Sequence, residues 1–300
     1  MGPTAAGKTA LAVEMVQHLP LEIVSVDSAM VYRCMDIGTA KPGADVLALA
    51  PHGLIDFVDP ADPYSAARFR QDALREMADI TARGKVPLLV GGTMLYFRAL
   101  THGLSLLPAA NAKVRARIDA LAAIHGWTAM HARLGKIDPV AAARIHPNDP
   151  QRVQRALEIF ELTGRTTTEL YAEPRSEVLQ YDIVRLALIP SDRARFRDRI
   201  RHRFEHMLAM GLIDEVAALR RRADLSPHTP ALRAVGYRQV WTYLDGRVDL
   251  GAMIVDATRA TWHLAKRQLT WLRAEHKAQV FESESRPLSK LIEAVAAALE

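Results

Sequence analysis

The sequence predicts an α/β protein, a parallel sheet with helices, into which an all-helical segment is inserted. Two apolar runs, LEIVSV at 21–26 and VPLLV at 86–90, are separated by a helical pattern, and this alternation is typical of a parallel sheet. Between about 103 and 176 the apolar residues follow helical spacing only. A strand pattern, IVRLALI, returns at 183–189. We therefore expect a core formed by 1–102 and 180–300, and a helical insertion over 103–179.

The first half of the core is predicted element by element. A helix over 7–19 begins in a glycine loop and ends before Pro20, and the strand at 21–26 is followed by Asp27. A helix over 65–84 then precedes the strand at 86–90, which ends in Gly-Gly-Thr at 91–93. Parallel strands bind ligands outside their carboxyl ends, so Asp27 and Thr93 should face the same crevice.

The rest of the chain is predicted to be mostly helical. The insertion is broken at proline and glycine positions, which are Pro108, Gly126, Pro139, Pro147, Pro150 and Gly164. The strand at 183–189 is closed by Pro190, so the sheet should resume there. Three further helices are expected, one from Ser191, one near Asp256 and one after Pro287.

Composition excludes several classes of protein. A chain of 300 residues, 49% hydrophobic and 24% charged, is neither disordered nor fibrous. No apolar run reaches the roughly 18 residues that span a bilayer, and no signal peptide is recognisable, so we expect a cytoplasmic protein with no membrane partner. The single cysteine, Cys34, excludes an internal disulfide and a cysteine-based zinc cluster.

The positive charge is concentrated in the middle of the chain. Residues 101–240 hold 22 basic and 15 acidic side chains, whereas the flanking segments are close to neutral. With a pI near 9.4, this distribution indicates a surface for a polyanion such as a nucleic acid. A solvated basic surface without a partner is the alternative.

The segment GPTAAGKT matches the phosphate-binding loop pattern G-x-x-x-x-G-K-[ST]. Its N–H groups and the following helix start would surround diphosphate oxygens, Lys8 would neutralise charge, and the Thr9 hydroxyl would bind Mg²⁺. The predicted diphosphate-binding residues are Gly2, Pro3, Thr4, Ala5, Ala6, Gly7, Lys8 and Thr9. Such a loop normally follows a strand, and here only Met1 precedes it. Either that strand is absent from this chain or the sheet is built without it.

The acidic and basic groups that would complete the site are less clearly marked. A nucleotide kinase or NTPase would carry an acid at the end of VPLLV, and none is present, which leaves Asp27 as the best acid or as a turn residue. Arginines occupy every second position from Arg193 to Arg203, and Arg197 and Arg203 flank an apolar helical stripe. One of these two could enter the site, while the others would lie on the surface.

Six segments occur in order from Gly2 to about residue 280: GPTAAGKT, SVDSAMVYRCMDIGTAKP, PLLVGGTMLYF, ARIHPNDPQRVQRALE, AVGYRQVW and LAKRQLTWLR. In sequence and in order they resemble the motifs of the bacterial tRNA isopentenyltransferase (tRNA dimethylallyltransferase) family. The resemblance implies a P-loop kinase-like core with a helical insertion that grips the anticodon arm. It also implies transfer of a dimethylallyl group from its diphosphate to N6 of the adenosine 3′ of the anticodon, position 37.

The resemblance implies roles for individual residues. Asp27, Thr9, Lys8 and Arg203 would be catalytic, with Asp27 accepting or orienting the N6 proton and Thr93 and Arg203 contacting the leaving group. Mg²⁺ at Thr9 would be the cofactor, tRNA and dimethylallyl diphosphate the partners, and the protein a monomer. The residues expected to contact tRNA are Asp27, Ser28, Ala29, Met30, Thr93, Arg115, Gln151, Arg152, Val153, Gln154, Arg155, Arg233, Ala234, Val235, Gly236, Tyr237 and Arg238.

Two other functions stay open at this point. A transferase acting on free adenine nucleotide would share the diphosphate site but would have little use for the basic middle segment. An RNA-binding P-loop protein that hydrolyses or senses nucleotide would need the acid that is absent after VPLLV. The donor and acceptor that react together would distinguish the three.

Overall fold

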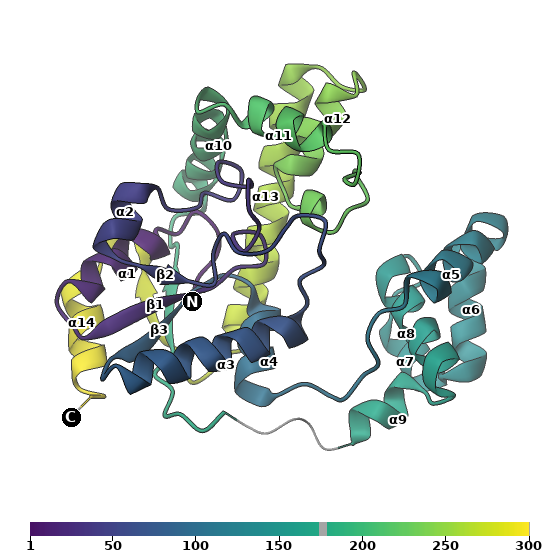
Figure 1. Cartoon of the computed structure of the whole chain (residues 1–300), viewed down its shortest axis with the longest axis horizontal. Helices are drawn as coiled ribbons and strands as arrows, with labels where there is room; N and C mark the ends of the chain where they lie inside the picture. Colours follow the sequence, from purple (N-terminus) through teal and green to yellow (C-terminus); the bar gives the residue numbers. More distant parts are fainter. Residues whose placement is uncertain (174–178, 300) are drawn as a thin grey trace. The chain divides into compact units, whose positions relative to one another are not determined.

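The computed structural model describes residues 1–173 and 179–299, which form two compact units (Figure 1). Residues 1–100 and 180–300 form the first unit, and 101–179 form the second. The end of the expected helical insertion, 174–178, and the last core residue, 300, lie outside the described residues. None of the helices within the described ranges is long and apolar enough to cross a membrane.

The first unit contains a small parallel sheet in the order β2-β1-β3. Strand β1 (Leu21–Val26) lies in the centre, between β2 (His52–Gly53) and β3 (Val86–Gly91). The strands expected at 21–26 and 86–90 are therefore confirmed. The two-residue β2 is too short for a periodic signal, and the sequence did not predict it.

Helices α1 (Lys8–Val16) and α3 (Ala66–Ala82) both pack on β1 and β3. Each begins near its predicted residue. Gly7 precedes α1 in a left-handed conformation, with φ 82°, which favours glycine. The Ser65 side chain caps α3 by accepting a hydrogen bond from the backbone N–H of Arg68.

The strand expected at 183–189 is shorter, and it belongs to a second sheet. Strand β4 (Leu186–Ile189) pairs in parallel with β5 (Gln279–Glu282), which the sequence did not predict. The ladder starts at Leu186 because β5 begins at Gln279, whose N–H donates to Arg185 O. Met1 lies along β4, where its amino group donates to Leu186 O and its carbonyl accepts from Leu188 N.

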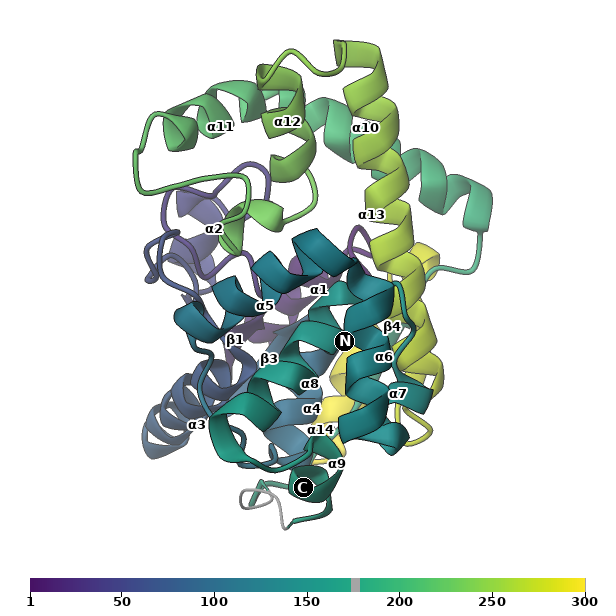
Figure 2. The ribbon, with the colours of Figure 1, turned by 90° about the vertical axis from the view of Figure 1, so that its right-hand side faces the viewer.

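The other helices of the first unit cover these sheets and extend away from them. The expected helices from Ser191, near Asp256 and after Pro287 are confirmed as α10 (Arg193–Ala209), α13 (Leu250–Arg273) and α14 (Leu288–Ala296). The sequence did not predict α2 (Ala44–Leu49), α4 (Met94–His102), α11 (Leu212–Arg220) and α12 (Tyr237–Leu244). Helices α11, α12 and α13 pack in succession (Figure 2).

One apolar cluster holds the phosphate-loop end of this unit together. It joins residues from the loop, α1, β1, β4 and α14, namely Ala6, Leu11, Met15, Leu21, Leu188, Leu291 and Val295. Helix α10 buries the predicted stripe of Phe196, Ile200, Phe204 and Met207. The phosphate loop is thus backed by core on more than one side.

The described part of the second unit is helical. It consists of α5 (Ala112–His125), α6 (Trp127–Ile137), α7 (Pro139–Arg144), α8 (Pro150–Thr163) and α9 (Thr167–Ala172). Its core is an apolar cluster from α5 to α8, centred on Ile118, Leu134, Val153 and Leu157. Asp149 caps α8, whose first residue is Pro150, as the sequence indicates.

Candidate active site

The phosphate loop is a buried turn whose ends are fixed by backbone contacts. Gly2, Pro3, Ala5 and Ala6 are buried, and Ala5 has a positive φ of 61°. The Lys8 ammonium folds back over the loop and donates to Pro3 O at 2.7 Å. Arg199 of α10 donates to Ala5 O at 3.3 Å. These contacts fix the conformation of the loop.

The structure brings the charges of Lys8, Asp27 and Arg203 together. Burial lowers the pKa of Lys8 to about 8, the Asp27 carboxylate opposes this shift, and Arg203 adds to it. Burial also lowers the pKa of Arg203, and Asp27 again acts in the opposite direction. Two cations beside one carboxylate leave excess positive charge, which suits a ligand with several negative charges.

Asp27 is placed by the end of β1. Its Oδ1 accepts hydrogen bonds from the N–H groups of Ala29 at 2.8 Å and Met30 at 3.2 Å. The hypothesis that Asp27 is a turn residue is therefore confirmed for Oδ1. Oδ2 has no hydrogen bond to any residue within the described ranges, so the carboxylate can be both a turn cap and a proton acceptor.

Thr93 lies at the same edge of the sheet. Its N–H donates to Val26 O at 3.2 Å, and its Oγ1 accepts from the Ser28 N–H at 3.1 Å. The ends of β1 and β3 are thus bonded to each other through the residues that follow them. Asp27 and Thr93 consequently lie at one edge, as the parallel arrangement requires.

The arginine run contributes two residues to the site, and Arg197 is not one of them. Arg197 is exposed, and its guanidinium lies 4.5 Å from the centre of the Trp262 ring. Arg203 is half-buried near Lys8 and Asp27, and Arg199 contacts the loop directly. The sequence pattern favoured Arg197 and Arg203 because both flank the apolar stripe of this helix. It did not predict Arg199, because Arg199 contacts a backbone carbonyl that is distant in sequence.

The first turn of α1 fits a magnesium ion held mainly by a phosphate ligand. Thr9 is half-buried there, and its hydroxyl makes no hydrogen bond to the part of the chain that the structure describes. Mg²⁺ in phosphate sites is held by few protein oxygens, together with phosphate oxygens and water. Among the described residues no cluster of three acidic, histidine or cysteine side chains could hold a metal alone.

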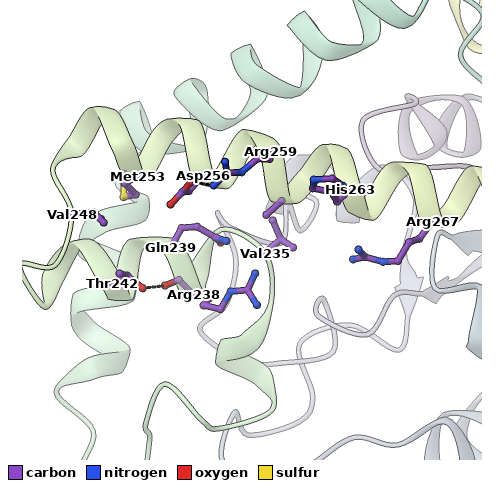
Figure 3. Close-up of a pocket in the computed structure, with 11 residues that line it drawn as sticks. Val235, Arg238, Gln239, Thr242, Val248, Met253, Asp256, Arg259, His263 and Arg267 are labelled. Atoms are coloured by element: carbon purple, nitrogen blue, oxygen red, sulfur yellow. Dashed lines mark hydrogen bonds and ion pairs between the residues drawn. The ribbon is translucent and has the colours of Figure 1, made fainter. Parts of the chain in front are cut away.

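A cavity of about 490 Å³ lies between α12 and α13 (Figure 3). Val235 and Arg238, two of the predicted tRNA-contacting residues, line it together with His263 and Arg267 of α13. Within the described ranges, Arg238 and Arg267 have no acidic partner, whereas Arg259 pairs with Asp256. The cavity therefore presents free positive charge.

Tyr237, in the same predicted segment, faces the interior instead. It is fully buried, and its hydroxyl donates to Glu215 Oε1 at 2.5 Å. Glu215 also accepts from the N–H groups of Asp36 and Ile37, in the loop that follows Asp27. Tyr237 holds that loop, so its side chain is unavailable for the expected tRNA contact. Gly236 is buried as well.

The predicted tRNA contacts of the second unit differ in exposure. Val153 is fully buried in the helical core, so its side chain cannot contact RNA. Arg115 and Arg155 both pair with the buried Glu158. Gln154 donates to Asp119, and the exposed Arg152 pairs, among the described residues, with Asp149 alone. Gln151 is exposed at the start of α8.

The glycine loop, two cations and a strand-end carboxylate together form a site that suits a ligand with several negative charges, as in enzymes that bind phosphate groups. The model of the IPP transferase family matches residues 30–275, and the chain belongs to this family. A tRNA dimethylallyltransferase of Thioalkalivibrio sulfidiphilus is 60% identical over the whole chain and 94% of its own length. One of Paraburkholderia xenovorans is 55% identical over the whole chain and 96% of its length.

Two solved structures are similar as well. The tRNA isopentenylpyrophosphate transferase of Bacillus halodurans matches with a TM-score of 0.72 and 38% identity, over 99% of this chain and 94% of that one. A eukaryotic dimethylallyltransferase described as acting on tRNA matches with a TM-score of 0.77 and 26% identity, over 94% of this chain and 72% of that one.

Proposed function

We propose that the protein transfers the dimethylallyl group of dimethylallyl diphosphate to N6 of the adenosine at position 37 of tRNA, releasing diphosphate. The observation that carries the proposal is the grouping of Lys8, Arg203 and Asp27 beside the phosphate loop. Family membership and the names of the similar proteins support the reaction class. A P-loop kinase-like core accounts for the loop and the parallel strands.

The donor half of the site stabilises the leaving group. As the bond between the allylic carbon and oxygen breaks, the electron pair leaves with the diphosphate and the carbon becomes cationic. Lys8, Arg203 and the loop N–H groups then compensate the negative charge that builds on the diphosphate. Thr9 would hold Mg²⁺, which adds further positive charge at the phosphate oxygens when bound.

The acceptor half positions the adenine amine. Its nitrogen lone pair forms the new bond to the allylic carbon, and one N6 proton must leave. The N–H groups of Ala29 and Met30 fix Asp27 through Oδ1, so Oδ2 can accept this proton. An adenine amine is a weak nucleophile, so its alignment with the allylic carbon contributes much of the rate.

The RNA would be bound through basic surfaces of both units. Arg238 and Arg267 in the α12–α13 cavity and Arg152 in the second unit offer exposed positive charge to phosphates. The target base must leave its stack to reach Asp27, and anticodon loops allow this more easily than duplexes do. We further expect a monomer that acts in the cytoplasm.

The decisive experiment offers the protein competing substrates. Labelled dimethylallyl diphosphate and Mg²⁺ are incubated with tRNA, with a transcript of the same tRNA in which guanosine replaces the adenosine 3′ of the anticodon, or with AMP. In a parallel series ATP replaces the donor. Label in the unchanged tRNA alone supports the proposal. Label in AMP would favour the free-nucleotide transferase, and ATP turnover without prenyl transfer would favour an RNA-dependent NTPase.

A further inference from the structure

Gln268, in the C-terminal part of α13, connects two segments that are distant in sequence. Its Oε1 accepts a hydrogen bond from Thr4 N at 2.8 Å, and its Nε2 donates to Gly92 O at 2.8 Å. The residue is buried, with 9% of its surface exposed. Because one neighbour is a donor and the other an acceptor, only one orientation of the amide satisfies both.

These segments are the two halves of the proposed site. Thr4 belongs to the phosphate loop, while Gly92 directly follows β3 and precedes Thr93, which bonds to the residues around Asp27. The contact also requires glycine at 92, since a Cβ there would lie 2.5 Å from Gln268 Nε2 and 3.0 Å from Gly2 O. The strand end and the loop are therefore packed against the same amide.

The bond to Thr4 changes the expected role of this residue. Its N–H is already occupied by Gln268, so it is not free to bind the diphosphate as the loop motif predicts. In place of a ligand contact, Thr4 provides an attachment point. The remaining loop N–H groups, Lys8 and Arg203 are left to bind the phosphates.

We infer that Gln268 is a positioning residue, which sets the distance between the donor loop and the carboxylate that receives the proton. This inference rests on the proposed function. A displacement of about 1 Å between reacting groups can cost on the order of 100-fold in rate, because in-line geometry is lost. Gln268 acts through the backbone of Thr4 and Gly92, to which both ends of its amide are bonded.

Two substitutions separate the two bonds. Gln268→Met has similar length and removes both bonds. Gln268→Glu keeps the acceptor for Thr4 N but brings a carboxylate oxygen towards Gly92 O. Single-turnover transfer at saturating donor should fall about 10- to 100-fold in Gln268→Met. The pH profile of the rate should keep its shape, since neither glutamine nor methionine titrates, and tRNA affinity should stay unchanged.

A readout independent of transfer is hydrogen–deuterium exchange of the peptide covering 2–9. Exchange should become faster in Gln268→Met, because Thr4 N–H loses its acceptor, and should stay closer to the unaltered protein in Gln268→Glu. Gly92→Ala disturbs the same contact from the other side and should also speed exchange. Thr261→Val, on the same helix, loses only a bond to Ala257 O and is the matched control.

The outcomes are distinct. Unchanged loop exchange and an unchanged single-turnover rate in Gln268→Met would overturn the inference. A change in tRNA affinity equal to the loss of rate would also overturn it, because Gln268 would then act on RNA binding. If the unaltered protein transfers no dimethylallyl group, the proposed function fails, while loop exchange and inorganic pyrophosphate binding still test the role of Gln268.

Discussion

Arg155 is bound to Glu158 in the second unit, with its Nη1 2.6 Å from Glu158 Oε2. Glu158 is fully buried, and it also accepts hydrogen bonds from Arg115 and from Asn111 N. Burial by itself acts to raise the pKa of Glu158, but the two arginines and the N–H group outweigh it, and the pKa is lowered. Arg155 also donates to Pro108 O, so it ties α8 to the segment before α5.

Replacement of Arg155 should therefore destabilise the protein. Arg155→Ala leaves a buried carboxylate with fewer partners, and we expect the free energy of unfolding of the second unit to fall by about 1–3 kcal/mol. Arg152→Ala, at an exposed position on the same helix, should change it by less than about 0.5 kcal/mol. Urea unfolding followed by circular dichroism measures the free energy of unfolding of both variants. Equal losses in the two variants would contradict the structural role of Arg155.

Arg152 is the better probe of RNA binding. Its side chain is 72% exposed, and within the part of the chain that the structure describes it pairs only with Asp149, so Arg152→Ala removes a charge without disturbing the helix core. If Arg152 contacts a phosphate, the salt dependence of tRNA affinity should become shallower by about one counterion. Titrations at several salt concentrations measure this slope. Arg165→Ala, another exposed arginine of this unit, is the control that should leave the slope unchanged.

The strands and helices that the sequence predicts best are those with a complete local signal. The strand at 21–26 is a mainly apolar run rich in β-branched residues, and α3 has both a serine cap and a helical stripe. Strand β5 carries no comparable signal, because three of its four residues are exposed and its pairing partner is about 90 residues away. Pairing at such separation cannot be inferred from local spacing.

The site shows the same difference. Lys8 and Asp27 are recognisable from a loop motif and a strand end, which are local patterns. Gln268 and Arg199 contact backbone atoms of the loop across more than 190 residues. Val153 was expected to contact tRNA, but the helix packing buries it. Side chains that bind distant backbone atoms leave no periodic signal in the sequence.

Asp27→Asn tests the proton acceptor with little change in the turn. An asparagine Oδ1 can still accept from Ala29 N and Met30 N, so the segment after β1 should keep its conformation. Single-turnover transfer should fall by a factor on the order of 100 or more, because the amide is a very poor base. Donor and tRNA affinities should change little. Full turnover in Asp27→Asn would show that another group accepts the proton.

A strand added before Met1 should alter how stability depends on pH. Burial, with a smaller effect of Lys8, lowers the pKa of the Met1 amino group to about 5, against 8.0 as its ordinary value. Between these values the unfolded chain binds a proton that the folded chain does not, so stability falls as the pH drops from 8 to 5. In a chain extended by about six residues, Met1 N becomes a backbone amide, which can still donate to Leu186 O but does not titrate. The difference in melting temperature between the extended chain and the unextended one should grow as the pH falls towards 5. A difference that stays constant with pH would contradict the prediction.

The charge of Lys8 should control diphosphate affinity above neutral pH. Its pKa is lowered to about 8, chiefly by burial, so the free protein loses this positive charge as the pH rises through that value. Affinity for inorganic pyrophosphate should then fall by up to about tenfold per pH unit, because binding must first restore the proton. Lys8→Arg stays charged throughout and should lack this decline. Calorimetric titrations from about pH 7 to 10 measure the pyrophosphate affinity of both proteins. The ratio of the two affinities is unaffected by the protonation of pyrophosphate itself, because that protonation is the same in both titrations. A ratio that does not change with pH would mean that Lys8 does not bind the diphosphate as a cation.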